Sequence, residues 1–520
     1  MTKTLQKFGG VSGKRFFGTN ILSKLILREL NIFPVPGENL FIIKGFNIYQ
    51  KGIKMVASPR HANLLLIAGP LSPQLRKAAA ISYSQMPRPR ILVTVDLQEV
   101  EPLPRPDLVI SPGELNQLPS KLKNRNLWAR DSEAYRPSFL VEEFEDDEEK
   151  DEHGEHNMNE HEDHGDHSSR DGNDDNEENG GHDQGGGDDF MSMIMMTKDM
   201  PRAADGLPMD MNEGRFGPFH LGLPDGLRIK MMLDGDTVKM ANFEKGLLSR
   251  HFLDNFPKDD PSELPGFLGN LDPLQPMAYK QLATKALRNT SNCPVNANIS
   301  ALEKERIIYH LLQIQTLLQN VGDQEMHFRI HKSLRDFLQD DSAEGIKKNT
   351  EKLKKRFYLK NRLRSCGKIP EMFLHHVSGP VARAAGKKLD HRMEDPDYAP
   401  FEAITLSENN AWGYLLVRLE EISQSLDLIK KFSEKGSSEL ITEKRTGYRE
   451  DYTGSAKIET ATGTACLDLN IRNGRIQKIK LKTPSVALAA MIPKISMQQE
   501  LSDALAGIAS LGISAWEIDK

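Results

Sequence analysis

Short apolar runs alternate with amphipathic stretches over the first 110 residues. The runs have the length and bounding residues of buried strands. The predicted strands are 40–43, 64–68, 91–95 and 107–110. Apolar residues at helical spacing predict helices over 19–30 and 73–86. Strands that alternate with helices are typical of a three-layer α/β domain with a parallel sheet, which we expect here.

The second half of the chain has longer helical periods, with strand patterns at both ends. The predicted helical stretches are 276–321, 323–363, 410–432 and 498–511. Alternating patterns predict a hairpin over 227–242 around Asp234-Gly235-Asp236, and another over 463–482 with its turn at Asn473-Gly474. This half therefore predicts an α+β domain, with a helical-bundle core and small terminal β elements.

A strongly acidic stretch separates the two halves. Between Glu142 and Asp189 the sequence has 22 acidic and 2 basic residues, a charge of −20. The rest holds 66 basic and 52 acidic residues, or +14, so the total of −6 conceals a basic body with an acidic insert. Too little apolar surface is present there to offset the entropy of ordering. We expect domains at 1–141 and 191–520, joined by a disordered linker at 142–190.

Composition excludes several classes of protein. Three cysteines in 520 residues, none in a CxxC pair, exclude a disulfide-stapled secreted domain. The first residues lack the apolar centre of a signal peptide, and no run of 18 apolar residues occurs. We therefore expect a cytoplasmic protein that is peripheral to a membrane at most. The +14 body matches no nucleic-acid motif, so no nucleic acid is expected as a partner.

Five segments of the second half resemble one family. Residues 217–228, Gly-Pro-Phe-His-Leu-Gly-Leu-Pro-Asp-Gly-Leu-Arg, are similar to the opening hairpin of the quinone-site subunit of respiratory complex I. The nickel-iron large subunit of group 4 membrane-bound hydrogenases opens in the same way. Residues 378–392 resemble the central loop of this family, 417–425 its following helix, and 482–485 with 512–520 its C-terminus.

The first half resembles the partner of that subunit. Residues 52–70 and 83–90 are similar to the small, iron-sulfur subunit of complex I and of the hydrogenases. The resemblance implies a flavodoxin-like α/β fold for residues 1–141. It also implies that two subunits are fused here through the acidic linker.

The cysteines that the resemblance would require are missing. The small subunit ligates a [4Fe–4S] cluster through cysteine thiolates, but residues 1–141 contain no cysteine, and Glu114 follows Pro112-Gly113 where the family has one. Nickel-iron chemistry needs two CxxC pairs, and the chain has none. We therefore expect neither a [4Fe–4S] cluster nor a nickel-iron centre, and a pseudoenzyme in place of a redox enzyme. Cys293, Cys366 and Cys466 are interpreted as small buried apolar residues.

One element of the family's quinone site persists. His220 matches the hairpin histidine, but the tyrosine position falls at Pro273, with Tyr279 six residues further along. Where the family has a segment with polar or charged groups, residues 313–320 have neutral amides or a hydroxyl at three of those positions. His220 therefore has two interpretations, as a structural hairpin residue or as one donor to a quinone.

Several charged residues of the family's motifs also persist. They are Arg383, Asp390, Arg392, Arg418, Glu420 and Glu421. In the family these positions lie near the small-subunit and membrane-arm interfaces, where ion pairs fix an arrangement. The alternative interpretation is ordinary surface charge.

Six histidines occur along the acidic linker. They are His153, His156, His161, His164, His167 and His182. Imidazole and carboxylate suit Zn²⁺ or Ni²⁺, but the irregular spacing predicts only weak binding. The alternative is a solvated, self-repelling spacer.

Three hypotheses for function follow. The first is a non-redox coupling or structural subunit of a complex I-like or hydrogenase-like ion-translocating complex, held at the inner face of the cell membrane by integral antiporter-like subunits. The second is a subunit of the NADH-quinone oxidoreductase type that binds a quinone near His220. The third is a metal-handling or assembly factor that acts through the linker histidines.

Overall fold

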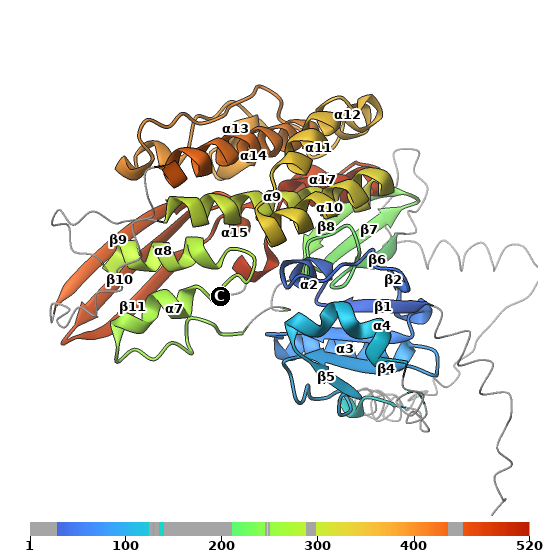
Figure 1. Ribbon diagram of the computed structural model, residues 1–520. Coiled ribbons are helices and arrows are strands. Elements are labelled where there is room, and N and C mark those ends of the chain that lie inside the picture. Colours follow the sequence, from blue (N-terminus) through green and yellow to red (C-terminus); the bar gives the residue numbers. More distant parts are fainter. Residues whose placement is uncertain are drawn as a thin grey trace, which may run out of the picture. The chain divides into compact units, whose positions relative to one another are not determined.

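The computed structural model describes residues 29–123, 128, 135–139, 211–244, 247, 250–287, 298–434 and 451–518. Residues 1–135 and 213–520 form one compact unit, and residues 136–212 form a second. The first unit holds two bodies, an N-terminal parallel sheet and a larger C-terminal body of helices and antiparallel sheets (Figure 1).

The N-terminal body is built on a five-stranded sheet with the strand order β2-β1-β3-β4-β5. Its strands are β1 (Leu30–Val35), β2 (Ile53–Met55), β3 (Leu64–Ala68), β4 (Ile91–Val95) and β5 (Leu108–Ile110), and every neighbouring pair is parallel. Every residue of β3 and β4 is buried, as expected for a parallel sheet whose central strands are covered on both faces.

The longer apolar runs of this body are predicted accurately. The strands predicted at 64–68 and 91–95 are confirmed with those bounds, and β5 is one residue shorter than predicted. The helix predicted at 73–86 is α3 (Pro73–Gln85). Its first turn is fixed by the Ser72 hydroxyl, which accepts a hydrogen bond from the Leu75 N–H at 3.1 Å, and by Pro73 at the first helical position.

The strand predicted at 40–43 is wrong. These residues lie in the short helix α2 (Glu38–Ile43), because a four-residue apolar run is equally compatible with a buried helix. A distant carboxylate stabilises the helical start, since Asp225 Oδ2 accepts a hydrogen bond from the Asn39 N–H at 3.1 Å. The first strand is Leu30–Val35 instead. The helix predicted at 19–30 falls mostly outside the described residues, and Leu30 already belongs to β1.

Two three-stranded sheets belong to the C-terminal body, with antiparallel pairing between β7 and β8 and throughout β9–β11. One is β6 (Asn212–Phe216), β7 (Ile229–Asp234) and β8 (Thr237–Phe243), and the other is β9 (Tyr452–Glu459), β10 (Thr464–Arg472) and β11 (Arg475–Lys482). Both predicted hairpins are confirmed. The second turns at Asn473 and Gly474, whose φ angles of 50° and 71° fit the left-handed conformation that tight hairpins require. The strand β9 was not predicted.

The two longest predicted helical stretches divide into shorter helices, whereas the stretch predicted at 410–432 is the single helix α14 (Ala411–Glu434). Residues 276–321 contain α8 (Pro276–Leu287) and α9 (Ile299–Asn320), and residues 288–297 between them lie outside the described part. Residues 323–363 contain α10 (Gln324–Asp340), α11 (Glu344–Lys354) and the start of α12 (Phe357–Arg364). Asp341 ends α10 in a left-handed conformation, φ 55°.

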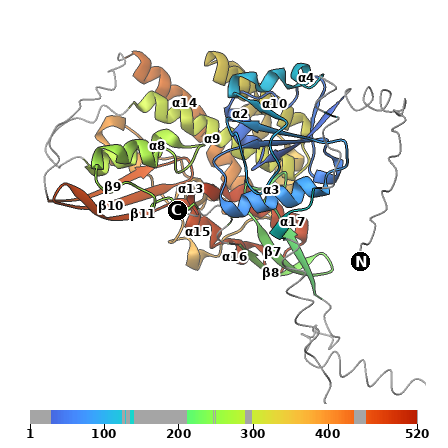
Figure 2. The same cartoon turned by 90° about the horizontal axis from the view of Figure 1, so that it is seen from below.

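The remaining helices complete this body around α9. They are α7 (Leu264–Leu268), α13 (Gly379–Ala384), α14 (Ala411–Glu434), α15 (Pro484–Ala489), α16 (Ile492–Ser496) and α17 (Leu501–Leu511). Helices α10, α14 and α17 pack against α9, while α7 and α8 lie over one face of the β9–β11 sheet (Figures 1 and 2). Among the described residues, no helix combines the length and apolar character needed to cross a membrane.

Candidate functional site

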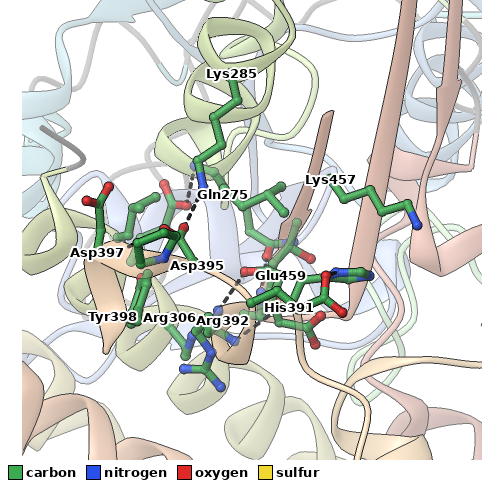
Figure 3. A pocket seen from close by; sticks show the side chains of 18 residues that line it. Gln275, Lys285, Arg306, His391, Arg392, Asp395, Asp397, Tyr398, Lys457 and Glu459 are labelled. Atoms are coloured by element: carbon green, nitrogen blue, oxygen red, sulfur yellow. Dashed lines mark hydrogen bonds and ion pairs between the residues drawn. The ribbon is translucent and has the colours of Figure 1, made fainter. Parts of the chain in front are cut away.

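A polar cavity of about 570 Å³ lies in the C-terminal body (Figure 3). Its walls come from α8, α9, strand β9 and the segment that holds the short turns His391–Met393 and Pro396–Tyr398. Charged side chains of both signs line it. Those labelled in Figure 3 are Lys285, Arg306, His391, Arg392, Asp395, Asp397, Lys457 and Glu459.

Most charges around this cavity are matched in pairs. Lys285 Nζ lies 2.5 Å from Asp395 Oδ2, and His391 Nδ1 lies 3.1 Å from Glu394 Oε2. The Tyr398 hydroxyl donates a hydrogen bond to Glu303 Oε1 at 2.8 Å. The lining therefore offers polar groups that are already partnered, which suits water better than a tightly held charged ligand.

Glu305 joins the cavity to the start of α8. Its two carboxyl oxygens accept hydrogen bonds from the Met277 and Ala278 N–H groups, at 2.5 and 2.9 Å. Burial raises the pKa of this carboxyl to about 8, although the backbone donors oppose the shift. Glu305 thus caps a helix and also carries a carboxyl that is readily protonated near neutral pH.

A buried ion network lies beside the cavity. Its members are Glu303, Arg306, His310, Arg383, Asp390, Arg392, Glu421 and Glu459, each at most 7% exposed. Arg383 is its centre, with guanidinium nitrogens 2.5 Å from Glu421, 2.6 Å from Glu459 and 3.3 Å from Asp390. Arg306, Arg392 and Glu459 also line the cavity, so the network reaches its wall.

The arginines keep most of the buried carboxylates charged. Although burial opposes ionisation, Arg383 holds the pKa of Glu421 well below its usual range. Burial likewise opposes the charge of Asp390, and Arg392 lowers its pKa to about 2 through nitrogens 2.7 and 3.0 Å from the carboxyl oxygens. The pKa of Glu459 is raised by burial and then by Asp390. Such a network fixes the relative positions of α9, α13, α14 and β9.

The six predicted scaffold residues lie in three different environments. Arg383, Asp390, Arg392 and Glu421 belong to the buried ion network, which excludes their interpretation as surface charge. Arg418 is also buried, and it donates hydrogen bonds at 2.8 Å to the carbonyl oxygens of Ser510 and Leu511, at the end of α17. Glu420 is 42% exposed and pairs with Lys354 at 2.8 Å, so it is a surface residue.

Sequence reasoning missed half of the network. The missed members are Glu303, Arg306, His310 and Glu459. Three of them lie on α9 at positions i, i+3 and i+7, which place them on one helix face. That periodicity of charged residues within an apolar helix was the available signal.

His220 lies apart from this network, in the loop after β6. Its ring packs edge-on against Phe216, with ring centroids 6.1 Å apart, and partial desolvation lowers its pKa although the residue is exposed. The adjacent cavity, lined also by Gly37, Asn39 and Thr316, has a volume of about 10 Å³, enough for about one water molecule. Burial raises the pKa of the nearby Asp225 to about 7. In this conformation the hollow beside His220 does not admit a quinone ring.

Pro273 and Tyr279 lie beside another buried polar cluster. The Tyr279 hydroxyl donates to Glu517 Oε1 at 2.7 Å, and Gln275 Nε2 donates to the same oxygen at 3.1 Å and to Asp272 at 3.2 Å. Burial raises the pKa of Glu517 to about 7. Tyr279 is therefore engaged by the C-terminus and does not face His220.

Metal ligands do not gather in the described part of the chain. No group of three or more His, Cys, Asp or Glu side chains there has the arrangement of a metal site. Cys366 and Cys466 are both unpaired thiols, the first of them buried. The six linker histidines and Cys293 lie outside the described residues.

A histidine pair on α10 was also missed. His327 and His331 are one helical turn apart and both buried, and both rings pack against Tyr49 of the N-terminal body, with centroids 5.8 and 5.3 Å away. The Tyr49 hydroxyl contacts His327 Nδ1, and His327 Nε2 lies 3.5 Å from Glu38. Burial lowers the pKa of His331 to about 3. The pair is therefore part of the packing between the two bodies.

Comparison with known proteins identifies one group of relatives. Residues 321–449 match the family model described as the 49 Kd subunit of respiratory-chain NADH dehydrogenase. The D subunit of NADH-quinone oxidoreductase from Desulfotalea psychrophila is 23% identical over 58% of this chain and 95% of its own length. The corresponding protein of Wolbachia sp. subsp. Brugia malayi is 25% identical over 42% of this chain and 68% of its own.

Two further similarities are to a hydrogenase subunit and to a chain of a respiratory membrane complex. The probable membrane-bound hydrogenase subunit mbhJ of Pyrococcus furiosus is 41% identical over 44 residues, which are 8% of this chain and 26% of that protein. A chain of the membrane-bound sulfane sulfur reductase, an archaeal respiratory membrane complex, is 20% identical with a TM-score of 0.49, and the match covers 60% of this chain and all of the other. By sequence, the chain is therefore similar to the D, or 49 Kd, subunit of NADH-quinone oxidoreductase.

Proposed function

We propose that this chain is a non-redox coupling or structural subunit of a complex I-like, ion-translocating membrane complex. It would lie peripherally at the inner face of the cell membrane and dock on integral antiporter-like subunits. One observation carries the proposal. The sequence similarity spans 95% of a D subunit, while residues 1–141, which resemble the cluster-binding small subunit, contain no cysteine.

The chemistry of cluster ligation supports the non-redox role. A [4Fe–4S] cluster is normally held by four thiolates. Residues 1–141 contain no cysteine, and the chain has three cysteines in all, far apart in sequence. A single carboxylate ligand at Glu114 would not replace four thiolates. That side chain is engaged elsewhere, with Lys121 Nζ 2.6 Å away.

The buried ion network supports the structural role. Dehydrating three arginines and four carboxylates is costly, and networks of this kind are retained where they specify one arrangement of elements. Here the network joins α9, α13, α14 and β9, and two of these, α13 and α14, lie within the residues that match the family model. A coupling subunit requires a fixed arrangement of its elements and does not require redox centres of its own.

We also propose that residues 1–141 form a flavodoxin-like domain fused to a large-subunit-like domain at 191–520 through the linker at 142–190. The strand order 2-1-3-4-5 with all strands parallel supports this, because it is the order of flavodoxin-like doubly wound sheets.

Iron and acid-labile sulfide analysis of the full chain, purified from its host with its membrane partners, tests the proposal. We expect no iron or sulfide assigned to this chain and co-purification with integral membrane subunits. About four irons per copy of this chain would overturn the non-redox role.

The quinone hypothesis gives a different result in the same preparation. Ligand pockets are about 300–1,000 Å³, against about 10 Å³ beside His220. Reduction of a quinone analogue by the complex that is lost on His220→Ala would favour an oxidoreductase subunit. Loss of function on deletion of residues 150–185, with the complex still assembled, would favour the metal-handling role of the linker.

A further inference from the structure

Residues 344–368 form the most basic stretch of the described surface. They include ten lysines and arginines and two glutamates. Helix α11 buries Ile346, Asn349, Thr350 and Leu353. At 100° per residue, Lys347, Lys348, Lys352 and Lys355 fall within an arc of about 140° on the opposite side. These four lysines and Phe357 are called the basic face.

The lysines of the basic face are exposed and unpaired. Within the described residues, none of the four has a carboxylate oxygen at ion-pair distance, whereas neighbouring Lys354 lies 2.7 Å from Glu351 and 2.8 Å from Glu420. Their charge is therefore available to a partner. Neither of the cavities described above is lined by the basic face.

An exposed aromatic side chain follows these lysines directly along the chain. Phe357, the first residue of α12, is 74% exposed, and Tyr358 is 47% exposed, while Leu359 and Leu363 are buried on the other side of the helix. A single exposed apolar residue is common on protein surfaces. Exposed aromatic rings beside unpaired lysines are the composition of segments that bind at the bilayer interface.

We propose that the basic face binds an anionic lipid bilayer directly. Ammonium groups attract anionic headgroups wherever they lie on the surface, so no pocket is required, and Phe357 inserts at the level of the headgroups. This goes beyond docking through partner subunits, because the chain would hold the membrane surface by itself. It would stand even if the proposed assembly were wrong.

The structure contains a matched control surface. Lys478, Lys480 and Lys482 alternate along β11 and are all exposed, so they share one open face of the β9–β11 sheet. No large apolar side chain of β9, β10 or β11 is exposed. This face offers similar charge without an aromatic ring.

Co-sedimentation of the full chain with vesicles tests the proposal. The vesicles are phosphatidylcholine alone, or phosphatidylcholine with roughly one-third phosphatidylglycerol. We expect binding only to the second, weakened at least about a hundredfold by Lys347→Glu/Lys348→Glu/Lys352→Glu, since each lysine contributes about fivefold. Lys478→Glu/Lys480→Glu/Lys482→Glu should change binding less than about threefold, because charges beyond a Debye length from the membrane are screened.

Insertion of the aromatic ring is measured separately, in a chain that keeps its lysines. In Phe357→Trp, brominated phosphatidylglycerol should quench the fluorescence of the new tryptophan. The fluorescence of Trp128, Trp412 and Trp516, which are at most 8% exposed, should not be quenched. Phe357→Ser should weaken binding about tenfold through lost apolar burial.

Four results would overturn the proposal. They are equal binding to both vesicles, equal losses from the two triple variants, absence of quenching at position 357, and binding of polyglutamate without binding of vesicles. The last would assign the face to an acidic protein. Thermal unfolding of each variant checks that the folded structure is intact.

Discussion

The buried ion network and the basic face use the same kinds of residue in opposite ways. In the network, Arg383 has three carboxylates within 3.3 Å and no exposure. On the basic face, Lys347, Lys348, Lys352 and Lys355 are exposed and lack carboxylate partners among the described residues. Charges that are matched and dehydrated fix the architecture, and charges that are left unmatched are available for something outside the chain.

The two regions also contribute differently to the net charge of the chain. The +14 outside residues 142–189 is not spread evenly, because residues 344–368 alone contribute +8. The network contributes almost nothing, since its three arginines face four carboxylates. Net charge therefore describes surfaces such as the basic face and says little about the scaffold.

Breaking the centre of the network should have the largest effect. Arg383→Met leaves Glu421 and Glu459 buried without their partner, so we expect the free energy of unfolding to fall by about 3–5 kcal/mol. Urea denaturation followed by circular dichroism measures it. Lys352→Met is the control for loss of one positive charge. Equal effects of the two variants would contradict the distinction between network and surface.

Arg418→Lys should have a smaller effect on the same scale. The guanidinium donates to two carbonyl oxygens at the end of α17, and a lysine cannot keep both contacts in that geometry. We expect a loss of about 1.5–3 kcal/mol, typical of hydrogen bonds to charged groups. Arg364→Lys, at an exposed position, is the matched control in the same denaturation experiment. A loss no larger than in that control would show that the capping contact is not stabilising.

The carboxyl of Glu305 predicts a pH dependence. Its pKa is raised from 4.5 to about 8, so the folded chain keeps a proton that the unfolded chain releases. The free energy of unfolding should therefore fall as the pH rises from 4.5 to about 8, relative to Glu305→Gln. Denaturation midpoints of both proteins across this range measure the difference, with Glu420→Gln as the surface control. A constant difference would contradict the raised pKa.

The smallest effect is expected on the basic face. Lys347→Ala and Lys352→Ala each remove a solvated, unpaired charge, so stability should change by less than about 0.5 kcal/mol. Thermal unfolding at low and high salt checks this. A loss above about 1 kcal/mol would mean that these lysines have partners within the fold.

Particular residues show how far sequence reasoning reaches. Runs such as 64–68 and 91–95 predict strands because full burial on two faces requires continuous apolar sequence. The similar run at 40–43 forms a helix because a carboxylate 186 residues away caps it, and no local pattern contains that contact.

The candidate site was less predictable than the fold. Arg383 and Glu421 were singled out through a family motif, but only the structure reveals Glu303, Arg306, His310 and Glu459 as their partners. Ion pairs join whichever segments the tertiary fold brings together, so the spacing of Glu303, Arg306 and His310 along α9 indicates a shared face but not their partners. The 10 Å³ hollow beside His220 is also beyond sequence reasoning, since it depends on packing between α2 and the loop after β6.

The network has a consequence for biosynthesis. Arg306 donates to the carbonyl oxygen of Thr460, 154 residues further along the chain. During translation the ribosome adds about 5–20 residues per second, so Arg306 is made well before its acceptors, the carbonyl oxygens of Glu459 and Thr460, exist. Until β9 emerges, α9 carries a charged side chain that lacks these two partners. The C-terminal body therefore completes its core only near the end of synthesis, and a chain cut short before Glu459 would expose α9 to proteases.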